Sequence, residues 1–334
     1  MRKFISIILI LAMALQLSSC NTVNGTKPND NSEIIETTNT DTIIEEEKPV
    51  AEENKPIEEE INKNPIMEEK EDLELKEKIN KIISKEKGLY SIGIKDLKNG
   101  TTVYLNDGKI SSASVIKVFV MAAAFKQAKE GKLDLNKKLT VTESFKVGGT
   151  GTLTVGSTKT IKQLIEYMIS ESDNTATNML ITEIEGKKIN QRKTDYDFKY
   201  INDTIAELGC KDTGLGYYVW YADFPKGVRN TTSVRDLNNF YEKLYRNAYL
   251  GKEYDGKMIK IMSTVQNTSK LPSQLPKGTI VAHKTGAITA HEHDAGIVFG
   301  PNNDFLISVL TKKASNPYKT IGQIAKTAYE HYNK

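Results

Sequence analysis

Cysteine is scarce in this sequence. Only two of its 334 residues are cysteines, Cys20 and Cys210. A disulfide framework and a cysteine-based zinc finger are excluded, because both need more thiols at close spacing. A glycine-rich phosphate loop and a dinucleotide fingerprint are also missing, so we expect no cofactor. No apolar run reaches the roughly 20 residues that cross a bilayer.

Negative charge is concentrated in one segment. The formal net charge is +3, but residues 21–70 hold 14 Asp and Glu against five Lys. The residues after them carry a net charge of +10. Their Lys and Arg do not cluster into basic runs, so the sequence predicts no nucleic-acid partner.

The first 20 residues have the pattern of a secretory signal. Two basic residues precede the 14-residue apolar stretch 4–17. It ends in Leu-Ser-Ser-Cys20, which resembles a bacterial lipobox, whose cysteine is lipidated. We therefore expect a lipoprotein signal peptide over 1–20, lipidation at Cys20, and an extracytoplasmic protein anchored to the cell membrane. An ordinary signal peptide with a chance cysteine is the alternative.

Residues 21–70 contain acidic clusters and no aromatic residue. Such a composition cannot bury enough apolar surface to offset the entropy lost on ordering. We expect a disordered acidic tether here, followed by one catalytic domain over residues 71–334.

The catalytic domain has strand patterns at both ends. Asn99-Gly100 joins two β-rich runs, which indicates a hairpin. The expected strands cover residues 89–97, 101–105, 279–283, 294–300 and 304–311. Helices are expected over residues 75–83, 114–130, 160–169, 174–184, 200–208, 233–247, 257–265 and 318–332.

The order of these elements predicts an α/β (α+β) fold with two lobes. Strands from both chain ends must meet in one antiparallel sheet flanked by helices, and the helical middle forms an all-helical lobe. Residues 114–130 are apolar nearly all round, which predicts a buried central helix. We expect a cleft between the sheet and the helical lobe.

Ser114-x-x-Lys117 stands at the start of that buried helix. The i, i+3 spacing puts hydroxyl and amine on one face. Burial lowers the pKa of a lysine, which can then accept the serine proton. The free N–H groups of the first turn, including that of Ser114, can bind an oxyanion. Ser84 and Lys87 match the same spacing on a charged helix, so the pattern alone is weak evidence.

Two further motifs support the interpretation of Ser114 as a nucleophile with Lys117 as its base. Ser172-Asp173-Asn174 lies between two expected helices, where a second hydroxyl can pass a proton to a leaving nitrogen. The alternative is that Ser172 or Asp173 merely caps the following helix. Lys284-Thr285-Gly286 ends an expected strand, where Lys and Thr can hold a carboxylate and Gly lets a ligand approach.

In this order, the three motifs resemble those of class A β-lactamases, within the serine β-lactamase and penicillin-binding protein superfamily. Arg229-Asn-Thr-Thr232 is similar to the Arg-Asp-Thr-Thr that closes the omega loop of that family. The resemblance covers about residues 72–334. It implies an acylated nucleophile, Ser114, with Lys117 as base and Ser172 as proton relay. It also implies substrate binding by Asn174, Lys284, Thr285 and Gly286, and an oxyanion hole from the N–H groups of Ser114 and Ala287. We expect no metal, because the chain has only four His and no evident third ligand beside His291 and His293.

The omega-loop segment departs from that family. Counting back from Arg229, Tyr217 stands where the family has the Glu that activates water, and Tyr221 stands where it has Asn. Asp223 is the one carboxylate in the segment, and Asn230 replaces the Asp of the closing element. We expect acylation to survive and deacylation to be slow, because general-base catalysis contributes about 10²–10⁴-fold. Asp223 or Lys117 could serve as the base instead.

Three functions remain open. The first is a β-lactamase-type serine hydrolase, the second a D-Ala-D-Ala peptidase or cell-wall amidase, and the third a non-catalytic, drug-sequestering module. The expected partner is thus a β-lactam or a D-Ala-D-Ala-like peptide, and a monomer is the default.

Two minor features complete the sequence. His291 and His293 share a side of an extended chain, and we favour His293 or Asp294 at the cleft rim over a metal pair. Cys210 is expected to be a small packing residue.

Overall fold

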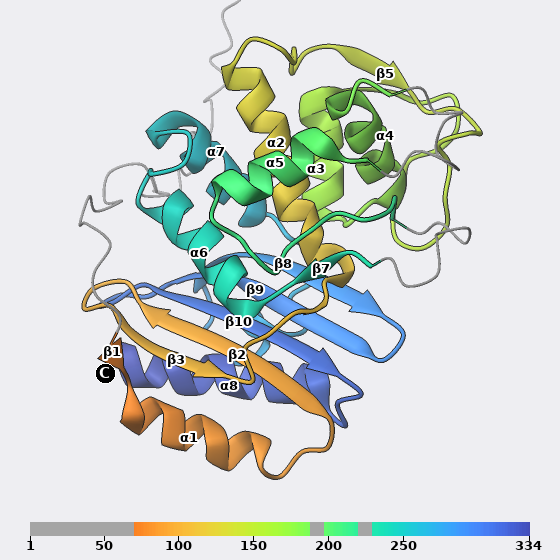
Figure 1. The fold of residues 1–334 in the computed structure, drawn as a ribbon. Helices are drawn as coiled ribbons and strands as arrows, with labels where there is room; N and C mark the ends of the chain where they lie inside the picture. Colours follow the sequence, from red (N-terminus) through yellow and green to blue (C-terminus); the bar gives the residue numbers. More distant parts are fainter. Residues whose placement is uncertain (1–69, 188–196, 220–228) are drawn as a thin grey trace, which may run out of the picture. The chain divides into compact units, whose positions relative to one another are not determined.

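The computed structural model describes residues 70–187, 197–219 and 229–334 (Figure 1). Six strands form its main sheet, in the order β1-β3-β2-β10-β9-β8. Their bounds are β1 Lys70–Glu71, β2 Leu89–Asp96, β3 Thr101–Leu105, β8 Ile280–Ile288, β9 His291–Phe299 and β10 Phe305–Lys312.

The strands of the two chain ends meet where β2 pairs antiparallel with β10, from Leu89 opposite Lys312 to Asp96 opposite Phe305. This confirms the prediction of one sheet built from both ends of the domain. The short edge strand β1 is the exception to the antiparallel pattern, since it runs parallel to β3.

Helices cover both faces of the sheet. Helices α1 (Leu73–Ile83) and α8 (Pro317–Tyr332) lie together below it in Figure 1. Above it lie α2 (Lys117–Lys129) and α6 (Val234–Tyr245), with α3 (Ile161–Ser170), α4 (Asn174–Ile184), α5 (Lys199–Glu207) and α7 (Lys252–Met262). The predicted α/β two-lobed architecture is therefore confirmed.

The alternation of side chains along the strands divides the core in two. Phe305, Ile307 and Val309 of β10 pack with α1 and α8, whereas Leu306 and Leu310 face the helical lobe. Successive strand residues point to opposite faces, so one apolar strand serves both cores.

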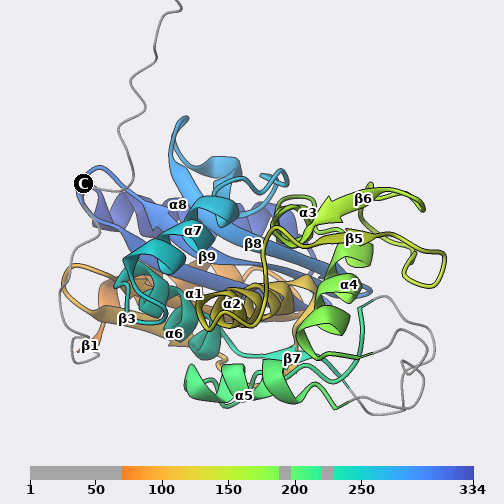
Figure 2. The ribbon, with the colours of Figure 1, turned by 90° about the horizontal axis from the view of Figure 1, so that it is seen from above.

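Helix α2 is the centre of the helical lobe. Figure 2 shows it surrounded by α3 to α7, and Phe119 on α2 stacks against Phe240 on α6 at 5.1 Å between ring centroids. Such an environment accounts for a helix that is apolar nearly all round, as the sequence predicted. The predicted capping box before α3 is also present, with Thr160 and Gln163 bonded reciprocally.

Two small two-stranded sheets and two 3-10 helices complete the described elements. β4 (Ile110–Ser111) pairs with β7 (Thr231–Thr232), and β5 (Lys138–Thr140) pairs with β6 (Thr158–Thr160). The 3-10 helices are η1 (Ala113–Ile116) and η3 (Leu271–Gln274). Over the described residues, no helix is long and apolar enough to cross a membrane.

Some boundaries differ from the prediction. The strand expected to end at residue 283 continues to Ile288, because β9 begins at His291 and pairs with it as far as Ile288. The Lys284-Thr285-Gly286 motif thus lies inside a strand and not at its end. The helix expected from residue 114 begins at Lys117, because Ser114 belongs to the preceding 3-10 turn.

Candidate active site

Ser114 lies in η1, half-buried, at the junction between strand β4 and helix α2. The segment is held from outside the helix, since the Ser112 N–H donates to the Asn230 carbonyl at 2.9 Å. Ala113 has φ = 45°, a left-handed conformation that persists in a non-glycine residue only where the surroundings impose it. The nucleophile candidate therefore sits on a constrained turn.

Strand β8 packs directly against this turn at Gly286. A Cβ atom on Gly286 would lie 3.1 Å from the Ser114 nitrogen and 3.1 Å from the Ala113 Cβ. Glycine is needed here for backbone-to-backbone approach, and so its role extends beyond the ligand access predicted from the sequence.

Lys117 is fully buried, and its amine lies among polar groups of the Ser172 turn. Nζ lies 2.7 Å from the Ser172 carbonyl, 3.1 Å from Ser172 Oγ and 2.8 Å from Asn174 Oδ1. These bonds join it to the second serine rather than to Ser114 Oγ. Burial holds the pKa of Lys117 well below its usual range, the Lys284 charge lowers it further, and Asp173 opposes both. The amine is thus suited to proton exchange with Ser172.

The Ser172-Asp173-Asn174 turn joins α3 to α4. Ser172 is half-buried with φ = 57°. Buried Asp173 caps α4 by accepting the Ala176 N–H at 2.7 Å, and it also accepts the Leu153 N–H at 3.1 Å. The capping alternative therefore holds for Asp173, while Ser172 and Asn174 contact the lysine.

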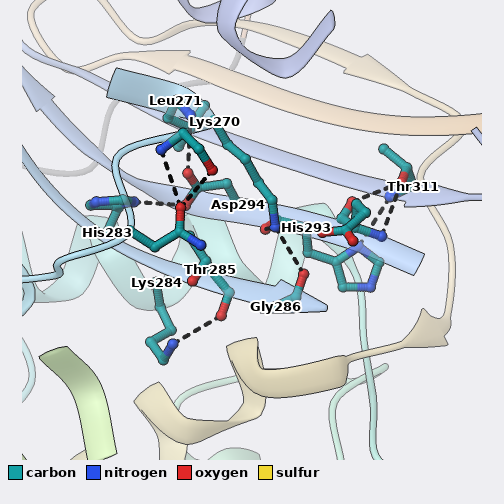
Figure 3. Close-up of polar contacts among 12 residues, drawn as sticks. Lys270, Leu271, His283, Lys284, Thr285, Gly286, His293, Asp294 and Thr311 are labelled. Carbon is teal, nitrogen blue, oxygen red and sulfur yellow. Dashed lines mark hydrogen bonds and ion pairs between the residues drawn. The ribbon is translucent and has the colours of Figure 1, made fainter. Parts of the chain in front are cut away.

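Lys284 is fully buried on β8, and its Nζ donates to the Thr285 carbonyl at 2.9 Å (Figure 3). Burial lowers the pKa of Lys284 to about 7, opposed by Asp294 and assisted by the charge of Lys270. The ammonium is therefore poised to lose its proton near neutral pH unless an anion stabilises it.

Lys270, which the sequence reasoning missed, also reaches this region. It is fully buried just before η3, and its Nζ donates to the carbonyls of Gly286 at 3.2 Å and His293 at 3.1 Å. It forms an ion pair with Glu292 at 2.7 Å. Its position 14 residues before Lys284 belongs to no local periodicity, so nothing in the sequence marked it.

These elements enclose a cleft of about 440 Å³. Three candidate groups of the three motifs meet there, since Ser114, Ser172 and Thr285 all line it. The other lining residues are Thr150, Gly151, Thr152, Ser170, Glu171, Gln266, Asn267, Lys270 and Ala287. Ser114 thus faces a ligand-sized space and not the packed core.

The side-chain amide of Asn230 joins the two ends of the omega-loop segment, residues 216–217 and 230, which we call the neck. Asn230 Oδ1 accepts the N–H groups of Gly216 at 2.8 Å and Tyr217 at 3.0 Å, and its Nδ2 donates to the Tyr217 carbonyl at 3.1 Å. Asn230 can therefore hold the neck without the carboxylate of the family pattern.

The two described tyrosines of this segment, Tyr217 and Tyr218, differ in burial. Tyr217 is half-buried, and burial raises the pKa of its phenol. Tyr218 is buried and packs edge-on against Phe198 at 5.1 Å, which is hydrophobic anchoring. Tyr221 and Asp223 lie outside the described residues, as does Cys20.

Two peripheral expectations can be checked. His293 and Asp294 are both fully buried, so the placement of either at the cleft rim was wrong; β9 is an interior strand with its side chains covered on both faces. Cys210 is buried, and burial raises the pKa of its thiol, as expected for a packing residue. Among the residues that the structure describes, no three His, Cys, Asp or Glu side chains gather as a metal site would require.

The comparisons with known proteins agree with this geometry. A family model described as the beta-lactamase enzyme family matches residues 74–332. The extended-spectrum β-lactamase PER-1 of Pseudomonas aeruginosa is 26% identical over 277 residues, 77% of this chain and 86% of that protein. β-Lactamase VEB-1 of the same organism is 28% identical over 246 residues, 68% of this chain and 79% of its own length.

Solved structures are similar as well. The structure of PBP-A superposes with a TM-score of 0.71 and 26% identity, covering 80% of this chain and 99% of PBP-A. A mutant of PBP-A, solved as an acyl-enzyme complex with penicillin G, gives a TM-score of 0.70, also with 26% identity, over 79% of this chain and 97% of its own. The family model, which matches most of the chain, and the similar fold show that this chain belongs to the β-lactamase enzyme family, as a β-lactamase-like serine hydrolase.

Proposed function

We propose that this protein opens β-lactams through an acyl intermediate on Ser114 and releases the acyl group slowly. The observation that carries the proposal is the meeting of Ser114, Ser172 and Thr285 in one cleft, with the Lys117 amine bonded to Ser172. The likeness to PER-1 and to an acylated PBP-A mutant supports the same substrate class.

Acylation needs a base for the Ser114 hydroxyl and an acid for the lactam nitrogen. The Lys117 amine, with its lowered pKa, takes the Ser114 proton as Oγ attacks the carbonyl carbon. Ser172, 3.1 Å from that amine, gives its own proton to the nitrogen as the C–N bond breaks, and regains one from Lys117. Of these transfers, the exchange between Lys117 and Ser172 takes place between groups that are hydrogen-bonded in the structure.

Substrate charge is accommodated at the β8 side of the cleft. The developing oxyanion would be stabilised by the N–H groups of Ser114 and Ala287. The substrate carboxylate would lie against Thr285 and the ammonium of Lys284, and Asn174 would bond the acyl-amide side chain. The second buried lysine, Lys270, adds positive charge next to Thr285 in the same lining.

Deacylation lacks an evident base. Tyr217 occupies the position of the family's water-activating Glu, and a phenol whose pKa is raised by burial stays protonated at neutral pH. Loss of general-base catalysis slows a step by about 10²–10⁴-fold. We therefore expect the acyl-enzyme to accumulate.

Intact-protein mass spectrometry over time with benzylpenicillin tests this proposal. The expected result is an adduct within seconds to minutes that decays much more slowly, and none with Ser114→Ala. Absence of any adduct on the wild type would overturn it. Glu171 also lines the cleft, with Oε2 accepting the Thr152 hydroxyl at 2.7 Å; E171Q decides whether this carboxylate assists deacylation.

A D-Ala-D-Ala peptidase or cell-wall amidase is the second candidate. It is favoured by Tyr217, because a peptidase of this superfamily releases its acyl group without that Glu, and by the likeness to PBP-A. Turnover of peptidoglycan peptides exceeding that of β-lactams would select it. An acyl-enzyme stable for hours, with neither product, would select a drug-sequestering module.

We also propose that Cys20 is lipidated and anchors the mature chain outside the cytoplasm, with residues 21–70 as tether. The lipobox-like sequence before Cys20 supports this. Membrane fractionation of cells that produce the full chain should find it in the membrane, and Cys20→Ala should release it. Equal partitioning of both chains would contradict the proposal.

A further inference from the structure

Asp294 is a fully buried carboxylate on β9 that the mechanism above does not use. It pairs with Thr285 across the β8–β9 ladder, one residue from Lys284. A carboxylate without exposure is costly to bury unless hydrogen bonds and nearby cations offset the lost hydration. The hydrogen-bond partners and nearby cations of Asp294 should therefore explain how this carboxylate is stabilised in the core.

Both oxygens of Asp294 are bonded, and each bond goes to a residue adjacent to a lysine. Oδ1 lies 2.8 Å from His283 Nδ1, which precedes Lys284 in the chain. Oδ2 accepts the Leu271 N–H at 3.0 Å, and Leu271 follows Lys270. Figure 3 shows the carboxylate between these two partners. One side chain thus ties together the two segments that carry the buried lysines.

The carboxylate also supplies charge. It opposes the effect of burial on the pKa of Lys284, while the ammonium of Lys270 acts in the reverse sense. The charged groups that act on Lys284 are Asp294 on β9, Lys270 before η3 and Lys117 from the helical lobe. Their own partners are Glu292, which pairs with Lys270, Asp173, which acts on Lys117, and His283 and Tyr241, which lie near Asp294.

We propose that Asp294 is a positioning residue: through its bonds to His283 and Leu271 it holds the segments of Lys284 and Lys270 beside the carboxylate-binding end of the cleft, and its negative charge favours the ammonium form of Lys284. The inference rests on the proposed function, because it assumes a substrate that carries a carboxylate. No substrate atom is expected to contact Asp294.

The sign of the pH effect follows from the geometry. Substrate capture needs the charged form of Lys284, so the acylation rate falls as the pH rises through the pKa of Lys284, about 7 in the free protein. Replacing Asp294 with a neutral residue removes a stabilising charge and moves that fall to lower pH. An opposite charge close by typically shifts a pKa by about one to three units.

The test is the second-order acylation rate of Asp294→Asn with benzylpenicillin between pH 5 and 9, followed by adduct mass. In D294N, the fall of the acylation rate at high pH (the high-pH limb) is expected to lie at least about one pH unit lower than in the wild type. The acylation rate should be about tenfold lower than that of the wild type at pH 8, and less reduced at pH 5.5. A uniform loss at every pH would show a purely structural role and overturn the proposal.

A matched control is Asp255→Asn. Asp255 is another fully buried aspartate that accepts two backbone N–H groups, from Tyr249 and Leu250, but on α7. Its variant should lose stability without moving the limb. Benzylpenicillin methyl ester, which lacks the carboxylate, should react equally with the wild type and D294N; a larger loss for the ester than for the acid would also overturn the proposal.

If D294N does not fold, His283→Asn provides the second test, because it keeps the charge and removes one of the two bonds. In this variant, the high-pH limb of the acylation rate should move in the same direction by a smaller amount. If the limb does not move and the ratio of the rates with benzylpenicillin and its methyl ester is unchanged, the proposal is contradicted. If the wild type forms no adduct at any pH, the proposed function fails and this inference with it. An adduct on the wild type with identical D294N and wild-type profiles overturns the inference alone.

Discussion

The β8 wall of the cleft and the omega-loop neck differ in what they preserve. On β8, Lys284 is buried with a lowered pKa, and Gly286 lies against the backbone of Ser114. At the neck, the backbone is closed by Asn230, and counting along the sequence predicts that Tyr217 stands where class A β-lactamases have the deacylating Glu. The β8 wall thus carries the charged groups expected for substrate binding, whereas the neck has a closed backbone but no carboxylate at Tyr217.

The difference separates the two halves of the reaction. In the proposed reaction, acylation uses the Lys117 amine and the Ser172 hydroxyl, which lie 3.1 Å apart. Deacylation by the route of class A β-lactamases would need a carboxylate that activates water, and Tyr217 supplies none. The proposed mechanism therefore predicts that acylation persists while deacylation is slow.

The largest expected effect is on acylation. Lys117→Met should slow adduct formation by about 10²–10⁴-fold, because the base is removed. The measurement is the second-order acylation rate with labelled penicillin. Lys126→Met on the same helix is the control, since the described contacts of Lys126 are ion pairs with Glu130 and Glu207 and a cation–π contact with Tyr200, all away from the cleft. A loss below about threefold in K117M would remove Lys117 from the mechanism.

Tyr217→Glu should accelerate deacylation. A carboxylate at this position should shorten the lifetime of the acyl-enzyme by about 10²-fold, the lower end of general-base catalysis, and leave acylation nearly unchanged. The decay of adduct mass after removal of free penicillin measures it. Tyr217→Gln, which adds no base, should not accelerate decay; equal acceleration in both variants would show that space and not charge is limiting.

Gly286→Ala tests the contact between β8 and the nucleophile turn. Its Cβ would lie 3.1 Å from the Ser114 nitrogen, and a displacement of a few tenths of an ångström should slow acylation by about tenfold. Gly256→Ala on α7 is the control, because a Cβ there meets nothing within 4 Å. If both variants acylate alike, the close approach has no catalytic importance.

Asn230→Ala should change the rate least. Three hydrogen bonds at the loop neck are lost, so we expect unfolding free energy to fall by about 2–4 kcal/mol, since unpaired buried groups cost about 1–3 kcal/mol each. Acylation should stay within about threefold, because the Asn230 carbonyl that holds Ser112 is retained. Denaturant unfolding and adduct rates measure the two effects. A rate loss as large as that of G286A would make the neck part of the acylation machinery.

Much of the architecture was predictable from local pattern. The alternation in the strands, the Asn99-Gly100 turn and the all-round apolar α2 placed both sheet halves and the central helix, because these signals depend on neighbours in sequence. The strand carrying Lys284 was placed too short, since its extension to Ile288 depends on pairing with β9.

The candidate site was predictable in part. Ser114, Ser172 and Thr285 were found by motif and line one cleft. Lys270 and Asp294 were missed or misplaced, because their significance comes from contacts with residues far away in the sequence, such as Lys270 with Gly286 and Asp294 with Leu271.

By itself, the sequence determined which chemical groups are present and their order along the chain, and it predicted Tyr217 in place of a carboxylate, since these follow from residue identity. Only the tertiary structure decided which of them are buried, which side chains line the cleft and which oxygen accepts from which N–H. Burial and Coulomb interactions depend on distance in space, so the pKa values of Lys117 and Lys284 are lowered only when the sheet and the helical lobe pack together.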